Sequence, residues 1–190
     1  MKVSLLADCP CVPWRNGGGR TRELLAWPDA HDWQLRVSVA DIEADGPFST
    51  FAGVERWFAV LQGQGVELSV GAARHRLARG DAPLRFDGAT PAACRLLDGP
   101  TRDLNLMLRR ATGSMQTTVD AQDWSPSAAQ CGLFSAVAGR CQSDTFDVAV
   151  PAYSLAWFAQ APQRLRFVAE QRPAALIGWW LATTPRESDA

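Results

Sequence analysis

The chain has 190 residues and a formal net charge of −1, and 47% hydrophobic with 21% charged residues is typical of an ordinary globular protein. It has no basic run and no interleaving of basic and aromatic residues, so we expect no nucleic-acid partner. No segment approaches the roughly 18 apolar residues of a membrane span, so we expect no membrane partner. The apolar stretch at residues 1–7 is too short for a signal peptide, and Asp8 follows where small residues are needed. This predicts a cytoplasmic protein.

The first half of the chain alternates apolar and polar residues between turn residues, and helical periodicity is nearly absent. Residues 33–39 predict a half-buried strand. Residues 56–61 and 66–70, joined by a Gly-Gln-Gly turn, predict a β-hairpin. Further short strands are expected at residues 74–77, 84–86 and 102–108.

The second half begins with a polar stretch, residues 112–127, which we interpret as a connector, and residues 119–129 are compatible with a short helix. Residues 186–190 are expected to fray. Regular short strands between Gly, Pro and Asp turns indicate an all-β jelly roll, in two β units, residues 1–110 and 111–190. The strands expected in the second unit are residues 132–138, 145–150, 154–159, 165–168 and 175–183. The aromatic residues expected in its core are Trp157, Phe158, Phe167, Trp179 and Trp180.

The five cysteines are an odd number, and no two have the Cys-x-x-Cys spacing of a redox or metal motif. In a reducing compartment we expect free thiols, with Cys94 and Cys131 packed as small apolar groups. The pair Cys9 and Cys11 is better explained by an N-terminal strand or turn than by a redox or metal role.

Residues 13–23 (PWRNGGGRTRE) contain three successive glycines among an indole, an amide, a hydroxyl, a carboxylate and three guanidiniums. Such a run forms either a tight turn or a backbone that approaches a ligand closely. The spacing does not fit a P-loop, which would need glycine in place of Trp14 and lysine in place of Arg20. A dinucleotide fingerprint would need glycine in place of Arg22. We therefore expect no nucleotide site.

Four stretches resemble the HutD/Ves family. They are residues 13–23; residues 36–40 (RVSVA); residues 46–49 (GPFS) with Phe51, Gly53 and Arg56; and Gly99-Pro100 with residues 103–107 (DLNLM). The resemblance covers most of residues 12–110, and beyond residue 110 it depends on spacing alone. It implies a cupin/RmlC-like jelly roll, a double-stranded β-helix, with a second, degenerate cupin-like half packed with the first as one compact unit. It also implies an association with histidine utilisation or the stress response.

Cupins commonly hold a metal with two or three histidines and a carboxylate, and this chain lacks that set. Its two histidines are His31, in a turn-like stretch, and His75, beside arginines on a predicted exposed strand. Where a cupin would carry a His-x-His pair, residues 55–57 are Glu-Arg-Trp. We therefore expect no metal and no other cofactor. The scarcity of histidine and the lack of a Gly-x-Ser-x-Gly elbow also argue against a Ser-His-Asp triad.

Residues 103–107 alternate, which puts Asp103, Asn105 and Met107 on one face of a strand and leucines on the other. The polar face is either solvated or lines the cavity of a barrel, and the family resemblance favours the cavity. Arg36 and Ser38 present the same choice between surface and pocket on their own strand.

Two charged residues have more than one candidate role. Arg56 begins a strongly apolar strand, where it is either a surface residue or a buried cation paired with Asp103, Glu23 or an anionic ligand. Asp103, if it does not face a ligand, is a structural partner of Arg56 or Arg102.

Glu23 is the only carboxylate of the glycine motif. It is either a general base or the ion-pair partner of Arg20 or Arg22.

The favoured function is a metal-independent protein that binds a small carboxylate of the formylglutamate or urocanate type, a ligand implied by the family association alone. In this hypothesis Arg56 pairs with the carboxylate, Asn16, Thr21 and Asn105 orient it, and Trp14 covers it. The role would be regulatory or protective. The candidate ligand-binding residues are Trp14, Asn16, Gly17, Gly18, Gly19, Thr21, Glu23, Arg36, Ser38, Arg56, Asp103, Asn105 and Met107.

The alternative is a metal-free cupin enzyme, an isomerase, hydrolase or epimerase, with Glu23 or Asp103 as a general base whose pKa is raised by burial. A third hypothesis is an interaction protein whose tryptophan-rich second unit docks a partner, which would show as an exposed aromatic patch. The sequence leaves open whether the chain forms a homodimer.

Overall fold

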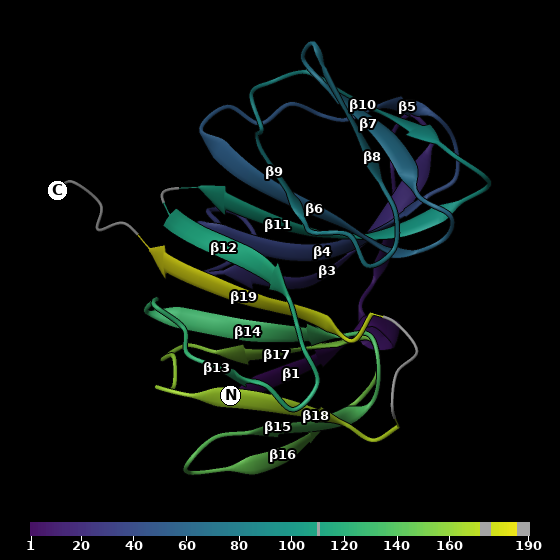
Figure 1. Ribbon diagram of the computed structural model, residues 1–190. Helices are drawn as coiled ribbons and strands as arrows, with labels where there is room; N and C mark the ends of the chain where they lie inside the picture. The colour runs from purple at the N-terminus through teal and green to yellow at the C-terminus, as the bar shows by residue number, and fades with distance from the viewer. Residues whose placement is uncertain (110, 172–175, 186–190) are drawn as a thin grey trace, which may run out of the picture. The chain divides into compact units, whose positions relative to one another are not determined.

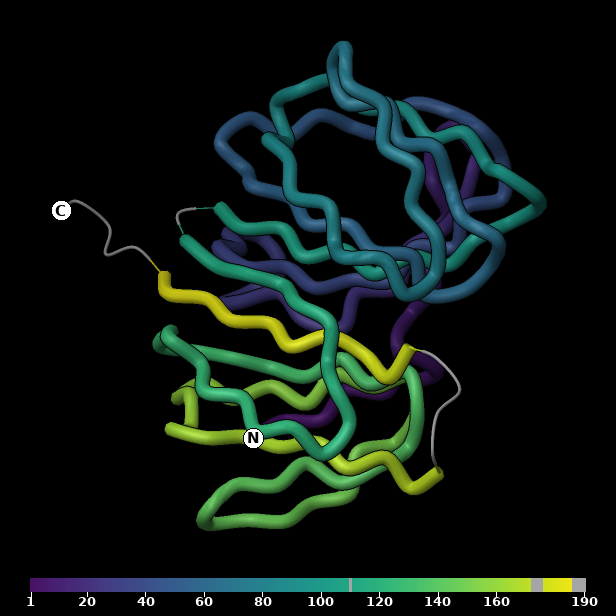
Figure 2. Tube along the Cα trace, viewed as in Figure 1, coloured from purple at the N-terminus to yellow at the C-terminus, as the bar shows by residue number. Residues whose placement is uncertain are grey.

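The computed structural model of the protein describes residues 1–109, 111–171 and 176–185. These residues form four antiparallel β-sheets and one 3₁₀ turn, η1 (Leu6–Asp8), so the predicted all-β class is confirmed (Figures 1 and 2). The sheets belong to two compact units, Pro10–Arg110 and Met1–Cys9 with Ala111–Ala190.

The unit Pro10–Arg110 contains two of these sheets. Across the first, the strand order is β2 (Cys11–Pro13), β3 (Gly19–Trp27), β4 (Leu35–Ile42), β11 (Thr101–Arg109), β6 (Val54–Gln62) and β9 (Leu84–Asp87). Across the second, the order is β5 (Gly46–Pro47), β10 (Ala92–Leu96), β7 (Val66–Val70) and β8 (Ala73–Leu77). Apolar side chains of both sheets form one buried cluster that includes Phe58, Leu68 and Cys94. The predicted burial of Cys94 is confirmed.

The predicted hairpin of residues 56–61 and 66–70 is wrong, although both strands exist. β6 pairs with β11 and β9, whereas β7 pairs with β8 and β10 in the other sheet. The turn between them carries the chain from one sheet to the other, with φ of +96° at Gly63 and +110° at Gly65. These left-handed angles favour glycine. The alternating pattern therefore identified the strands but not their partners.

The other unit contains the two remaining sheets. The order in one is β1 (Lys2–Leu5), β17 (Ser154–Phe158), β14 (Gln130–Ser135), β19 (Gly178–Pro185) and β12 (Ala111–Thr117). The order in the other is β13 (Asp123–Trp124), β18 (Leu165–Ala169), β15 (Gly139–Gln142) and β16 (Asp147–Val150).

Two sequence-based assignments differ from this arrangement. The predicted division puts residues 1–9 in the first unit, but β1 pairs with β17, from Lys2 opposite Trp157 to Leu5 opposite Ser154 (Figure 1). The first part of the polar connector, up to Thr117, is instead the strand β12, which pairs with β19 (Figure 2). Residues 119–129, all described, contain no helix. Because β12 has mostly small and polar side chains, its sequence pattern does not indicate a strand. It forms a strand by pairing with β19, which is distant in the sequence. The predicted strand start at residue 175 and the predicted fraying at residues 186–190 lie outside the described residues.

The aromatic core predicted for the second unit is confirmed. Phe158, Phe167 and Trp180 belong to one buried cluster, which also contains Cys131. Trp157 and Trp179 are buried as well.

The surface of the described residues offers no exposed aromatic patch. Their exposed large hydrophobic side chains are Met1, Leu5, Val12 and Val119. The interaction-protein hypothesis therefore lacks the feature that would mark it. The described part of the chain also contains no helix with the length and apolarity that crossing a membrane requires.

Candidate functional site

A cavity of about 550 Å³ lies on one face of the first sheet of the unit Pro10–Arg110. Its inner wall consists mainly of buried side chains of β4, β6 and β11, to which Arg36 of β4 and Thr21 of β3 add half-buried polar groups. Its mouth is bordered by the β2–β3 turn and by the segment at residues 47–51. The volume is that of a small-molecule site.

Strand register explains why polar side chains meet in this cavity. Asn105 of β11 lies opposite Ser38 of β4, and Met107 of β11 lies opposite both Arg36 of β4 and Arg56 of β6. Because alternate residues of a strand share a face, all five side chains line the cavity. The choice between surface and pocket is thereby settled for these five residues.

Arg56 is the central cation of the cavity and is only 8% exposed. Nη1 donates to the carbonyl oxygen of Ser49 at 3.3 Å, and Nη2 donates to Oδ1 of Asn105 at 3.4 Å. Both bonds are long for N–H···O hydrogen bonds. Among the described residues no carboxylate lies within ion-pair distance of this guanidinium. Neither Asp103 nor Glu23 is its partner. Of the three predicted partners of a buried Arg56, only the anionic ligand is left.

Three phenylalanine rings surround the Arg56 guanidinium. Its Cζ lies 5.3 Å from the ring centroid of Phe48, 5.8 Å from that of Phe51 and 5.0 Å from that of Phe86. Burial lowers the pKa of Arg56 to about 10, which leaves it charged at neutral pH. A buried cation held only by aromatic faces and two long hydrogen bonds retains capacity for an anion.

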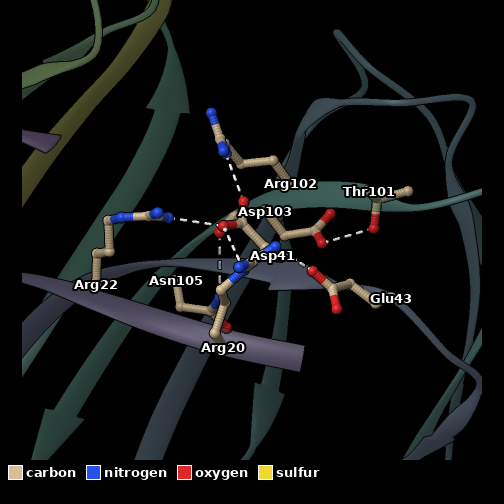
Figure 3. A network of polar contacts seen from close by, with 8 residues as sticks. All are labelled: Arg20, Arg22, Asp41, Glu43, Thr101, Arg102, Asp103 and Asn105. Carbon is tan, nitrogen blue, oxygen red and sulfur yellow. Dashed lines mark hydrogen bonds and ion pairs between the residues drawn. The ribbon is translucent and has the colours of Figure 1, made fainter. Parts of the chain in front are cut away.

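Asp103 lies on the same strand face but is fully buried and does not line the described cavity. Thr101 Oγ1 donates to Oδ2 at 2.8 Å, and Oδ1 has no hydrogen-bond partner among the described residues (Figure 3). Burial raises the pKa of Asp103 to about 8. The predicted pairing with Arg102 is wrong, because Arg102 binds another carboxylate.

That carboxylate is Asp41, which is not among the predicted site residues. Arg102 Nε and Arg22 Nη1 each lie 2.6 Å from it, and Arg20 Nε lies 3.5 Å away (Figure 3). Arg20 also pairs with Glu43. Burial raises the pKa of Asp41, but the hydrogen bonds from Arg102 and Arg22 outweigh it and hold the pKa below its usual range. Only the strand register reveals this role, because it sets Asp41 opposite both Arg20 and Arg102.

Glu23 pairs with Arg36, whose Nε lies 2.6 Å from Glu23 Oε2. The predicted pairing with Arg20 or Arg22 is therefore replaced by a pairing across β3 and β4. Glu23 does not line the described cavity, so it offers no general base there.

The glycine run is a turn rather than a ligand cradle. Gly17 has a φ of +72° and donates its N–H to the carbonyl of Trp14 at 3.1 Å. Trp14 N–H donates to the carbonyl of Gly19 at 2.9 Å, and Gly18 N–H donates to Oδ1 of Asn16 at 3.1 Å. None of the three glycines lines the described cavity. The glycines instead shape the turn that carries Trp14 and Asn16, and these two residues do line the cavity.

Replacing Gly19 with Ala is expected to destabilise the fold by about 3 kcal/mol or more, because the new Cβ would be overpacked. It would collide with the carbonyl oxygen of Asp41 and lie 3.2 Å from the Trp14 ring. Gly17→Ala is the matched control, since it meets no atom within 4 Å and costs only the left-handed φ, about 1–2 kcal/mol. Urea unfolding measures both, and equal destabilisation of the two variants would contradict this account of Gly19.

Trp14 forms one side wall of the cavity. Its Nε1 donates to Thr21 Oγ1 at 2.7 Å, and its ring packs edge-on against Phe48 with centroids 6.3 Å apart. Thr21 keeps its own O–H for another acceptor. Both residues line the cavity as predicted, together with Asn16.

Several lining residues were absent from the predicted set. Arg15 comes from the glycine motif, and Phe48, Ser49 and Phe51 come from the stretch that resembles the family. The family resemblance pointed to that stretch. Its place in the cavity wall follows only from the structure, in which the Arg56 guanidinium lies against the rings of Phe48 and Phe51.

The donor set of the cavity does not fit a divalent cation. The described lining residues include no histidine, cysteine or carboxylate, and they include Arg15, Arg36 and Arg56. Guanidiniums donate hydrogen bonds and cannot ligate a metal. Within the described residues, no group of three or more His, Cys, Asp or Glu side chains is placed to hold a metal ion.

The family model for HutD matches residues 6–177 of the chain. The chain belongs to the HutD family. This HutD-family protein is 42% identical over 104 residues to the 21.2 kDa protein of the hutC 3′ region of Pseudomonas putida, covering 53% of this chain and 54%, about half, of that relative. It is 32% identical over 161 residues to Protein Ves of Cronobacter sakazakii, covering 84% and 87% of the two chains.

Solved structures confirm the cupin fold for this HutD-family chain. HutD from Pseudomonas fluorescens is similar with a TM-score of 0.81 at 25% identity, over 98% of this chain and 99% of that chain. A conserved protein of unknown function from Pseudomonas aeruginosa gives 0.83 at 28% identity, over 96% of each. A mutant of Bacillus subtilis oxalate decarboxylase gives 0.65 at 8% identity, over 100% of this chain and 78% of that chain, which is a likeness of fold alone.

Proposed function

We propose that this HutD-family protein binds a small carboxylate in the cavity without a metal, in a regulatory or protective role in histidine utilisation or the stress response. The observation that carries the proposal is the buried guanidinium of Arg56, which lines the cavity and lacks a carboxylate partner among the described residues. An uncompensated buried charge is costly, and an anionic ligand compensates it.

The cavity supplies the other parts of such a site. Phe48 and Trp14 provide apolar walls, and the hydroxyls of Thr21 and Ser38 provide polar groups beside them. A guanidinium binds a carboxylate through paired N–H donors, which gives orientation as well as affinity. A relative from the hutC 3′ region and a neighbour named HutD agree with a ligand from histidine breakdown, of the formylglutamate or urocanate type.

The enzyme alternative has less support from the geometry. A general base must reach the proton that it removes. Glu23 is paired with Arg36, and Asp103 is buried away from the cavity, so neither proposed base lies on the described lining.

Isothermal titration of the protein with N-formyl-L-glutamate and with urocanate tests the proposal. We expect at least one of them to bind, and Arg56→Gln to weaken that binding about 30-fold or more, because a desolvated charge pair is lost. The matched control is Arg95→Gln, an exposed arginine that is paired with Glu67 and does not line the cavity. If Arg56→Gln left the binding of either ligand unchanged, the proposal would be refuted.

A further inference from the structure

Within the described part of the chain, two of the three arginines on the cavity lining lack a counterion. Arg36 is compensated by Glu23 at 2.6 Å. Arg56, at the inner wall, and Arg15, at the mouth, have no carboxylate partner among the described residues. A ligand with one negative charge would compensate only one of these two cations.

Arg15 sits on a backbone that is fixed in place. It lies in the turn closed by the hydrogen bond from Trp14 N–H to the Gly19 carbonyl, and the next residue, Asn16, caps the turn by accepting from Gly18. The Trp14 side chain is in turn held by Thr21. The exposed side chain of Arg15 therefore starts from a fixed point of the cavity mouth rather than from a free loop.

Apart from its arginines, the cavity lining is largely apolar. Ile42, Phe48, Phe58 and Met107 all line the cavity. A lining that combines two uncompensated cations with apolar side chains suits a short chain that carries an anionic group at each end.

We infer that Arg15 is a specificity-determining residue that makes the cavity prefer dianionic over monoanionic ligands, with Arg56 receiving one anionic group and Arg15 the other. The inference depends on the proposed carboxylate-binding function and adds the class of ligand and the residue that selects it. Because Arg15 is exposed, its contribution is modest and is screened by salt.

The test compares ligands that differ by one charge at nearly constant shape. N-formyl-L-glutamate and N-formyl-L-glutamine form one pair, and glutarate and its half-amide form a second. At low salt we expect the dianion of each pair to bind about threefold to fivefold more tightly. Arg15→Gln is expected to remove this preference by weakening only the dianion, and about 0.5 M salt is expected to reduce it in the unaltered protein.

Arg79→Gln is the matched control, because it removes one exposed positive charge away from the lining. It is expected to leave the preference intact. Equal affinity for the two members of each pair, or equal weakening of both by Arg15→Gln, would overturn the role of Arg15 and leave the proposed function standing. Failure of all four ligands to bind the unaltered protein would overturn the proposed function for these ligands and the inference with it.

Discussion

Asn105→Asp is expected to weaken ligand binding strongly while making the folded protein more stable. The Oδ1 atom of Asn105 lies 3.4 Å from Arg56 Nη2, and the Nδ2 atom lies 3.5 Å from the Asp103 carbonyl oxygen. An aspartate of nearly the same shape places a carboxylate beside the buried guanidinium. Arg56 then has an internal counterion, which occupies the position that we assign to the ligand.

The sizes of the two effects follow from this competition. Ligand affinity is expected to fall about 100-fold or more, because the ligand must displace a tethered carboxylate. The free energy of unfolding at neutral pH is expected to rise by about 2 kcal/mol, because the long amide contact becomes a charge-assisted hydrogen bond. Arg56→Gln weakens binding without this gain, so the two variants separate loss of the cation from its neutralisation.

Calorimetric titration and urea unfolding measure both effects. Gln64→Glu, which makes the same change at an exposed turn position of the same unit, is the control and is expected to alter neither. Retention of full affinity in Asn105→Asp would show that Arg56 is not the ligand's counterion.

The sequence predicted which residues form this site better than it predicted how they are arranged. Alternation correctly grouped Asp103, Asn105 and Met107 on one face, but it could not say which face was inward. Both faces of β11 are buried, since Leu104 and Asp103 are each fully shielded from solvent. A pattern of apolar and polar residues reports burial only when one face meets water.

Pairing between strands was the part that local sequence could not supply. Three arginines and Asp41 come from β3, β4 and β11, and only the register reveals that they form one network. The same gap explains the wrong hairpin of β6 and β7. The family resemblance supplied the cupin fold, and it included Phe48 and Phe51 without assigning them a place in the wall.

Asp103→Asn is expected to stabilise the protein at alkaline pH and to leave it nearly unchanged at about pH 4. Burial raises the pKa of Asp103 to about 8, above the ordinary value of 3.8. The folded state therefore holds this proton more tightly than the unfolded state. Below about pH 4 both states are protonated, and the buried carboxylic acid carries no penalty.

As the pH rises from about 4 to 8, the unfolded state releases the proton while the folded state keeps it. The free energy of unfolding contributed by this group falls by about 1.4 kcal/mol per pH unit in that window, and the loss is complete above the folded pKa. Summed over the window, the loss reaches several kcal/mol. An asparagine cannot ionise, so the variant does not lose this free energy of unfolding. It also keeps the shape of the side chain and an acceptor for the Thr101 hydroxyl.

Urea unfolding of both proteins across pH 4 to 9 measures the difference in free energy at each pH, which should widen steadily with pH. The difference is the quantity to follow, because Asp41, whose pKa is lowered in the folded state, contributes a slope of the opposite sign to both proteins. Asp98→Asn removes an exposed carboxylate and serves as the control, with no change in slope expected. Parallel stability curves for the unaltered protein and Asp103→Asn would mean that Asp103 is ionised in the fold at neutral pH, which would require a compensating cation or water at its unpartnered Oδ1.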